Sequence, residues 1–115
     1  MRRGFTLIEI MIVIGILGMI LSIAGPLWIR QRTLSRQRVC QQNLAQIDGA
    51  KEMWAMQNMM GGAALPDWTD LISADGTGFI KKVPECPADG DYTIGNVATR
   101  PRCNVTVPLD HNDRD

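Results

Sequence analysis

An apolar run from Phe5 to Ile29 constrains this chain more than any other feature of its sequence. Glu9 is the only charged side chain in the run. About twenty apolar residues form a helix of about 30 Å, which is enough to cross a bilayer. An ionised carboxylate in hydrocarbon costs a few kcal/mol or more and is rarely kept without a partner. The run therefore predicts a membrane helix with one functional acidic side chain.

The same run has a second interpretation, as a secretory signal peptide. Arg2 and Arg3 form a basic n-region, and Ser22-Ile23-Ala24 approximates a small-x-small cleavage site. Cleavage after Ala24 would release a secreted binding module. Glu9 argues against this alternative, because a disposable signal peptide has no use for a buried carboxylate.

Size and charge exclude several classes of protein. The chain has 115 residues, which allows one small domain and no multidomain enzyme. Its 12 Lys and Arg balance its 12 Asp and Glu, so no net charge favours nucleic acid as a partner. His111 is the only histidine, and the sequence has no nucleophile motif and no phosphate-binding loop. We therefore expect a protein that is not an enzyme.

The segment Gly4-Phe5-Thr6-Leu7-Ile8-Glu9 follows a basic leader and opens the apolar helix. It resembles the N-terminus of type IV pilins and type II secretion pseudopilins. The resemblance implies that a prepilin peptidase cleaves between Gly4 and Phe5 and methylates the new N-terminus. It also implies that Glu9 neutralises the N-terminal amine of a neighbouring subunit. Pro26 stands where pilin-like proteins commonly have a helix proline, which implies a role in assembly.

This resemblance implies a structural subunit of a type II secretion pseudopilus or of a type IV pilus-like filament. The implied partners are further copies of the chain, the prepilin peptidase, the membrane and the inner-membrane assembly platform. The chain is shorter than many type IV pilins, which favours a pseudopilin or a minor pilin. A monomeric membrane-anchored periplasmic domain remains an alternative. Crosslinking between N-terminal helices distinguishes it, because a monomer gives no ladder.

The implied location is the inner membrane, with one span, a cytoplasmic N-terminus and a periplasmic head. One pattern opposes this orientation, because arginines follow the apolar run and a positive-inside count favours a cytoplasmic C-terminus. These residues are Arg30, Arg32, Arg36 and Arg38. Prepilin processing needs Gly4 on the cytoplasmic side, so we give it precedence over the count.

The patterning predicts an α+β fold, in which a long kinked N-terminal helix packs on a small antiparallel β head. The expected parts are a leader at 1–4, a transmembrane assembly helix at 5–29, an amphipathic helix at 30–60 and a head at 61–115. A kink or local unwinding is expected between Gly18 and Pro26. Apolar positions recur at helical spacing, and Gly61-Gly62 is expected to end the helix. The recurring positions are Cys40, Leu44, Ile47, Ala50 or Lys51, and Trp54.

Residue types after position 50 predict the core packing, a short helix and two strands of the head. Methionines around Trp54 are expected to pack in the core. Asp67 or Thr69 is expected to cap a short helix, and residues 75–78 are expected to stop it. Residues 91–94 and 103–107 alternate like strands and are expected to pair antiparallel.

The three cysteines suggest that a disulfide bond stabilises the head. Cys86 and Cys103 enclose a loop of about eighteen residues, for which a disulfide contributes about 3 kcal/mol. Cys40 would remain a buried free thiol, although pairing of Cys40 with another cysteine stays open. A zinc site is disfavoured, because the chain has no CxxC motif and one histidine. Related pseudopilins bind calcium, but the acidic segments 89–91 and 110–115 favour a solvated surface, so no cofactor is expected.

Overall fold

The structure, a computed structural model, describes residues 3–72 and 78–112. It forms two compact units, Met1–Arg32 and Thr33–Asp115, which we describe separately. The fold is α+β with a long N-terminal helix, as predicted. Its elements in chain order are α1 (Leu7–Gln57), α2 (Trp68–Leu71), β1 (Tyr92–Thr93) and β2 (Arg102–Cys103).

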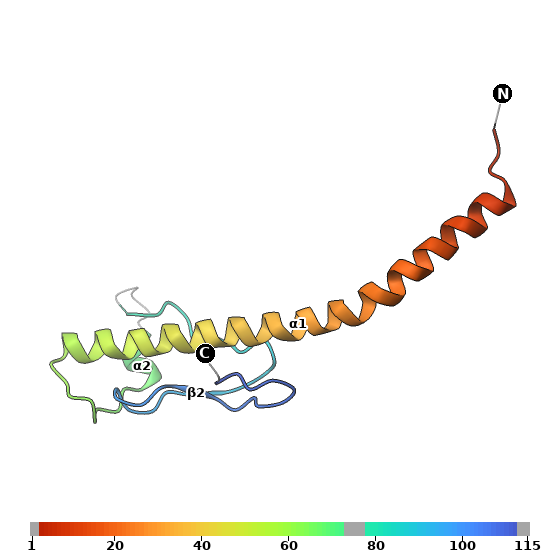
Figure 1. Cartoon of the computed structure of the whole chain (residues 1–115). Helices are drawn as coiled ribbons and strands as arrows, with labels where there is room; N and C mark the ends of the chain where they lie inside the picture. Colours follow the sequence, from red (N-terminus) through yellow and green to blue (C-terminus); the bar gives the residue numbers. More distant parts are fainter. Residues whose placement is uncertain (1–2, 73–77, 113–115) are drawn as a thin grey trace. The chain divides into compact units, whose positions relative to one another are not determined.

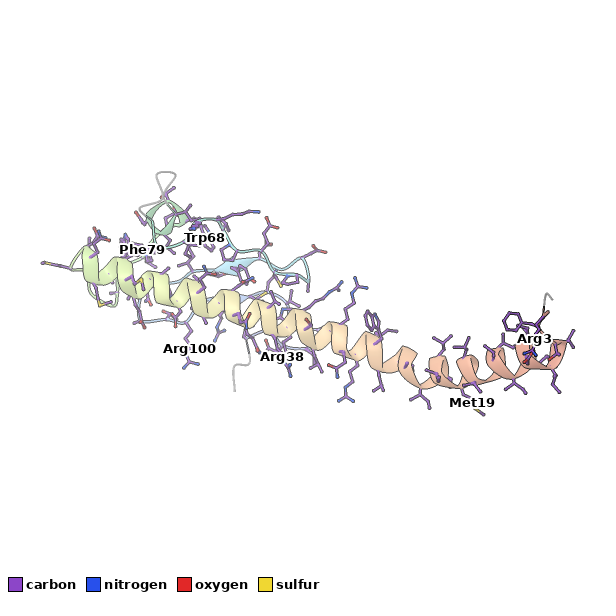
Figure 2. The ribbon with its side chains drawn as sticks, turned by 90° about the horizontal axis from the view of Figure 1, so that it is seen from above. Arg3, Met19, Arg38, Trp68, Phe79 and Arg100 are labelled. Carbon is purple, nitrogen blue, oxygen red and sulfur yellow. The ribbon has the colours of Figure 1, made fainter. Side chains whose placement is uncertain are left out.

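The first unit contains the apolar part of α1. This helix is long and apolar enough to cross a membrane, with a mean hydropathy of 2.6 over a window of which nothing is buried. Residues 3–32 are all exposed, and Figure 2 shows the side chain of Met19 projecting away from the ribbon. The expected local unwinding is not present, because residues 18–26 are helical throughout and Pro26 lies inside α1. Transmembrane helices in general tolerate the loss of the one backbone hydrogen bond that a proline cannot donate.

The second unit packs the head along one face of the C-terminal part of α1 (Figure 1). The buried positions of α1 recur at helical spacing, which confirms the predicted face. They are Cys40, Leu44, Ile47, Ala50, Lys51 and Ala55. The burial of the charged Lys51 shows that this face is not purely apolar.

A two-stranded antiparallel sheet completes the head. Tyr92 pairs with Cys103 and Thr93 with Arg102, so the predicted pairing is confirmed. The second strand is shorter than predicted and ends at Cys103 instead of reaching Val107. Beyond it, the N–H of Asn104 donates to the carbonyl of Asp91 at 3.1 Å, and the side chain of Asn104 accepts from the N–H of Asp91 at 2.9 Å.

Two clusters of buried residues form the core. The first joins α1 and α2 to the following loops through Ile47, Ala50, Leu71, Ile80 and Ile94. Trp68 and Phe79 are partly buried against it and lie on the same side of α1 in Figure 2. The second cluster contains Leu44 and all three cysteines. The head therefore has one aliphatic core and one core rich in sulfur.

The methionines near the end of α1 are exposed, so the prediction that they pack in the core is wrong. The exposed fraction is 54% for Met53, 72% for Met56 and 96% for Met59. Helical spacing puts them on the side opposite the buried face. Only Trp54 in this group is partly buried against the aliphatic core.

Helix α1 also ends earlier than the glycine pair predicts. Met59 adopts the left-handed conformation, with φ of 53°. The N–H of Met60 donates to the carbonyl of Ala55 at 2.9 Å, and the N–H of Met59 donates to that of Met56 at 3.4 Å. These two bonds form a Schellman motif with methionine at the position that glycine usually occupies.

The short helix in the head agrees with the prediction. Asp67 is the N-cap of α2, and its side chain accepts from the N–H of Trp68 at 2.8 Å. The carboxylate of Asp70 accepts from the N–H of Asp67, also at 2.8 Å, which closes a capping box. The predicted stop at residues 75–78 lies largely outside the described residues.

Candidate functional site

The N-terminus of α1 has a capping box formed by Thr6 and Glu9. The backbone N–H of Thr6 donates to Oε2 of Glu9 at 2.8 Å, and its hydroxyl donates to the same oxygen at 3.0 Å. The N–H of Glu9 donates in return to the Thr6 hydroxyl at 3.3 Å. Within a single chain, Glu9 thus stabilises the start of α1. Both bonds to the carboxylate use Oε2.

The predicted processing position precedes this cap. Gly4 is exposed and lies before the first residue of α1, and Phe5 is 85% exposed. Phe5 and Glu9 also line an open pocket of about 290 Å³ whose other walls are aliphatic, formed by Ile10, Ile12 and Val13. The structure therefore places Gly4 and Phe5 ahead of α1 and Glu9 in an apolar setting within its first turn.

The head gathers a group of side chains that the sequence reasoning did not bring together. Cys40 on α1, Cys86 in the loop before β1, Cys103 on β2 and His111 near the C-terminus are all buried. Their ligand atoms all lie within 4.8 Å of one another. In the described part of the chain, this is the only group of three or more His, Cys, Asp or Glu side chains that converge in this way.

Two distances define the inner part of this Cys3His cluster. The sulfur atoms of Cys86 and Cys103 are 3.8 Å apart. The Nδ1 atom of His111 lies 3.4 Å from the sulfur of Cys86. All three cysteines have free thiols in this structure. The predicted Cys86–Cys103 disulfide remains a prediction, and Cys40 is buried as expected but lies beside these two cysteines.

Hydrogen bonds hold the ligands of the Cys3His cluster in place. The side chain of Asn112 accepts from the N–H of Cys103 at 2.8 Å and donates to its carbonyl at 2.9 Å. This clamp fixes the segment that carries His111, whose own N–H donates to the carbonyl of Val105 at 3.2 Å. The hydroxyl of Tyr92 donates to the sulfur of Cys40 at 3.4 Å.

The thiols of the Cys3His cluster differ in acidity. Burial raises the pKa of Cys40 to about 12. Burial also raises the pKa of Cys86, but hydrogen bonds to its sulfur from the backbone N–H groups of Ala88 and Gly90 reverse this, and the net direction is down. The pKa of Cys103 is raised by burial, although a backbone N–H of Val105 acts in the opposite direction. The backbone around Cys86 therefore favours a thiolate.

Gly90 lets the backbone approach the cluster. A Cβ atom at this position would lie 2.6 Å from Cγ2 of Val105 and 2.7 Å from the sulfur of Cys103. Real Cβ atoms do not approach their neighbours so closely. The glycine in the segment 89–91 is therefore required by packing against Cys103, a role that the sequence reasoning did not assign.

A second buried polar residue organises the other end of the head. The Nζ atom of Lys51 is 2.9 Å from the carbonyl oxygen of Ile94 and 3.0 Å from that of Asn96, and it also donates to the carbonyl of Thr99. Asp48 lies 3.6 Å from the same nitrogen. The ammonium thus satisfies three carbonyls of the loop after β1 at once.

Comparison with known proteins shows which family the chain resembles. Residues 1–25 match the family described as the prokaryotic N-terminal methylation motif. The chain is 32% identical over 104 residues to type II secretion system core protein G of Klebsiella pneumoniae, covering 81% of this chain and 74% of that protein. It is 26% identical over 105 residues to the protein of the same name from Escherichia coli strain K12, covering 83% of this chain and 72% of that protein.

No solved structure is similar enough to this chain to count as a match. The similarity to the two secretion proteins extends along most of each chain, and the N-terminal motif accompanies it. The chain therefore belongs to the type II secretion system core protein G family, and it is a pseudopilin.

Proposed function

We propose that this pseudopilin waits in the inner membrane and assembles, through the apolar part of α1, into the short filament of a type II secretion system. One observation carries the proposal: residues 5–29 are all exposed although Glu9 is their only charged side chain. Such a surface needs a bilayer before assembly and neighbouring helices afterwards. Head-to-tail contacts that do not close generate a filament. The role is structural and not catalytic.

Processing by a prepilin peptidase fits the start of the chain. The bond between Gly4 and Phe5 precedes α1 and is exposed, so a protease can reach it without unwinding the helix. Cleavage there requires a cytoplasmic N-terminus and places the head in the periplasm. The new amine of Phe5 then begins one residue before the capping box.

Glu9 provides the contact that sets the register between subunits. Its Oε2 atom is used by Thr6 within the chain, which leaves Oε1 to accept from the N-terminal amine of a neighbour. The aliphatic walls around Glu9 strengthen such a pair, because charges in an apolar setting stabilise each other only at short range. Pro26 contributes by weakening the helix locally, so that α1 can adapt during packing.

Two substitutions separate the charge of Glu9 from its role in the cap. Glu9→Gln keeps an oxygen that accepts from Thr6 but removes the charge, and it is expected to stop filament assembly without preventing membrane insertion. The matched control, Thr6→Val, removes the hydroxyl of the cap and keeps the charge, so its filaments are expected to form. Filament yield from cells and the membrane fraction are the two readouts. Normal filaments from Glu9→Gln would contradict the pairing.

N-terminal sequencing of the protein from its native membrane tests the processing. The expected start is N-methylated Phe5. A start at Gly25 would identify a secreted module instead, and an intact Met1 would contradict both cleavage and the proposed orientation. Crosslinking between N-terminal helices in cells then distinguishes a filament subunit, which gives a ladder, from a monomeric anchored domain.

A further inference from the structure

We propose that Cys40, Cys86, Cys103 and His111 bind one Zn²⁺ ion as a closed structural site. Three thiolates and an imidazole are a ligand set that favours zinc, and four protein ligands leave no open position for a substrate. Binding releases the three thiol protons to solvent, and no electron is transferred. The proposal goes beyond filament assembly and does not depend on it.

The distances within the Cys3His cluster match a tetrahedral zinc site. With Zn–S bonds of about 2.3 Å and tetrahedral angles, two ligand sulfurs lie about 3.8 Å apart, and a sulfur and a nitrogen lie about 3.6 Å apart. The observed separations are 3.8 Å between the sulfurs of Cys86 and Cys103 and 3.4 Å between the sulfur of Cys86 and Nδ1 of His111. The remaining pairs lie within 4.8 Å, so small side-chain movements close the tetrahedron.

Hydrogen-bond donors lie beside the ligands of the Cys3His cluster. The hydroxyl of Tyr92 donates to the sulfur of Cys40, and Asn43 in turn donates to that hydroxyl at 3.1 Å. Such donors orient metal ligands and offset the excess negative charge of three thiolates.

The position of His111 distinguishes a metal site from a simple disulfide. The residue is 2% exposed, and its Nδ1 atom lies 3.4 Å from the sulfur of Cys86. A disulfide between Cys86 and Cys103 would involve two of the four side chains. It would not explain why the polar ring of His111 is buried beside their sulfur atoms. A zinc ion uses all four.

The site also lies where the head most needs reinforcement. It joins α1, the loop before β1, β2 and the C-terminal segment, whereas each strand has only two residues. A small domain with so little sheet is usually stabilised by a metal or by disulfides. Cys86 also lines a surface pocket of about 420 Å³, so one ligand of the site borders the surface.

Metal analysis of the full-length protein tests the proposal. The chain is purified in detergent, without chelators, from cells in which it is exported, and zinc is measured by elemental mass spectrometry. We expect one zinc ion per chain, and three thiols that react only after denaturation with a chelator. Replacing zinc with Co²⁺ should produce thiolate charge-transfer absorption and the strong visible bands of tetrahedral cobalt.

Two variants separate the zinc site from the disulfide. Cys40→Ser and His111→Ala each remove a ligand that a Cys86–Cys103 disulfide does not use. Each is expected to weaken zinc binding by at least about 100-fold and to change the cobalt spectrum. The control, Ile94→Ala, opens a cavity in the aliphatic core and leaves all four ligands in place, so its zinc content should remain one ion per chain.

Two results would overturn the proposal. The first is wild-type protein with no bound zinc and a mass two daltons below that of the reduced chain, which would establish the disulfide. The second is unchanged zinc binding in both Cys40→Ser and His111→Ala. If either variant fails to fold, the thiol count and the cobalt spectrum of the wild-type protein still decide between the two states. Neither result would bear on filament assembly, which has its own readout.

Discussion

The ammonium nitrogen of Lys51 lies 2.9 Å from the carbonyl oxygen of Ile94, at a position where a helix would ordinarily bury an apolar side chain. Lys51 is fully buried. Its charge is compensated by loop carbonyls and by Asp48, 3.6 Å away. The last turns of α1 and the loop after β1 are thus joined through a single side chain.

Lys51→Met is expected to lower the free energy of unfolding by about 3 kcal/mol. The substitution conserves length but leaves buried carbonyls without a donor, and each such group costs about 1–3 kcal/mol. Urea unfolding of the full-length protein in detergent measures the effect. Lys82→Met is the control, because Lys82 is exposed and its ion pair within the described residues is with the exposed Glu85. Equal stability of the two variants would contradict the assigned role of Lys51.

Gly90→Ala is expected to destabilise the head by about 1–3 kcal/mol, as overpacking of a filled site does. The added methyl group would collide with Val105 and with the sulfur of Cys103. The same variant should bind less zinc, since Cys103 must move. Gly49→Ala is the matched control, because a Cβ there meets nothing within 4 Å and alanine favours a helix interior. Thermal unfolding should show a lower midpoint for the first and a higher one for the second.

Met59→Gly is expected to stabilise the protein by about 1 kcal/mol. The left-handed conformation at Met59 strains a residue with a Cβ and does not strain glycine. The side chain is 96% exposed, so its removal loses no packing. Met60→Gly serves as the comparison, since the φ angle of Met60 is not positive. A loss of stability in Met59→Gly would show that the exposed methionine contributes packing that this structure does not contain.

Asp67→Ala is expected to cost about 1 kcal/mol, the usual value of a lost N-cap. The effect should be local to α2, so hydrogen exchange is the appropriate measurement. The amide of Ile72, which donates to the carbonyl of Trp68 at 2.9 Å, should exchange faster. Asp67→Asn keeps a side-chain oxygen at the cap and should preserve most of the protection. Equal exchange rates in wild type and Asp67→Ala would contradict the capping role.

Local patterns predicted much of the fold. The buried face of α1 was found from helical spacing, and a cap at Asp67 or Thr69 and the antiparallel pairing of segments 91–94 and 103–107 followed from local residue types. The same local reasoning failed for Met53 and Met56, because it assigned them to the core by residue type although their helical spacing puts them opposite the buried face. It also placed the end of α1 at a glycine pair, although Met59 provides the turn.

The Cys3His cluster shows why spacing rules did not predict the candidate metal site. The absence of a CxxC motif argued against zinc, but that motif describes ligands that one local turn holds together. Here Cys40, Cys86, Cys103 and His111 come from separate parts of the chain, so no short motif contains them. The available clue was that three cysteines and a single histidine occur in one small domain.

The sequence by itself determined a helix long and apolar enough to cross a membrane, the N-terminal methylation motif and the side of α1 that is buried, because these depend on hydropathy and on patterns within a few residues. Only the tertiary structure decided that His111 meets the cysteines and that Lys51 meets the carbonyls after β1. Those contacts depend on how loops without a repeating pattern pack against α1. Their geometry is set by the whole head and by no single segment.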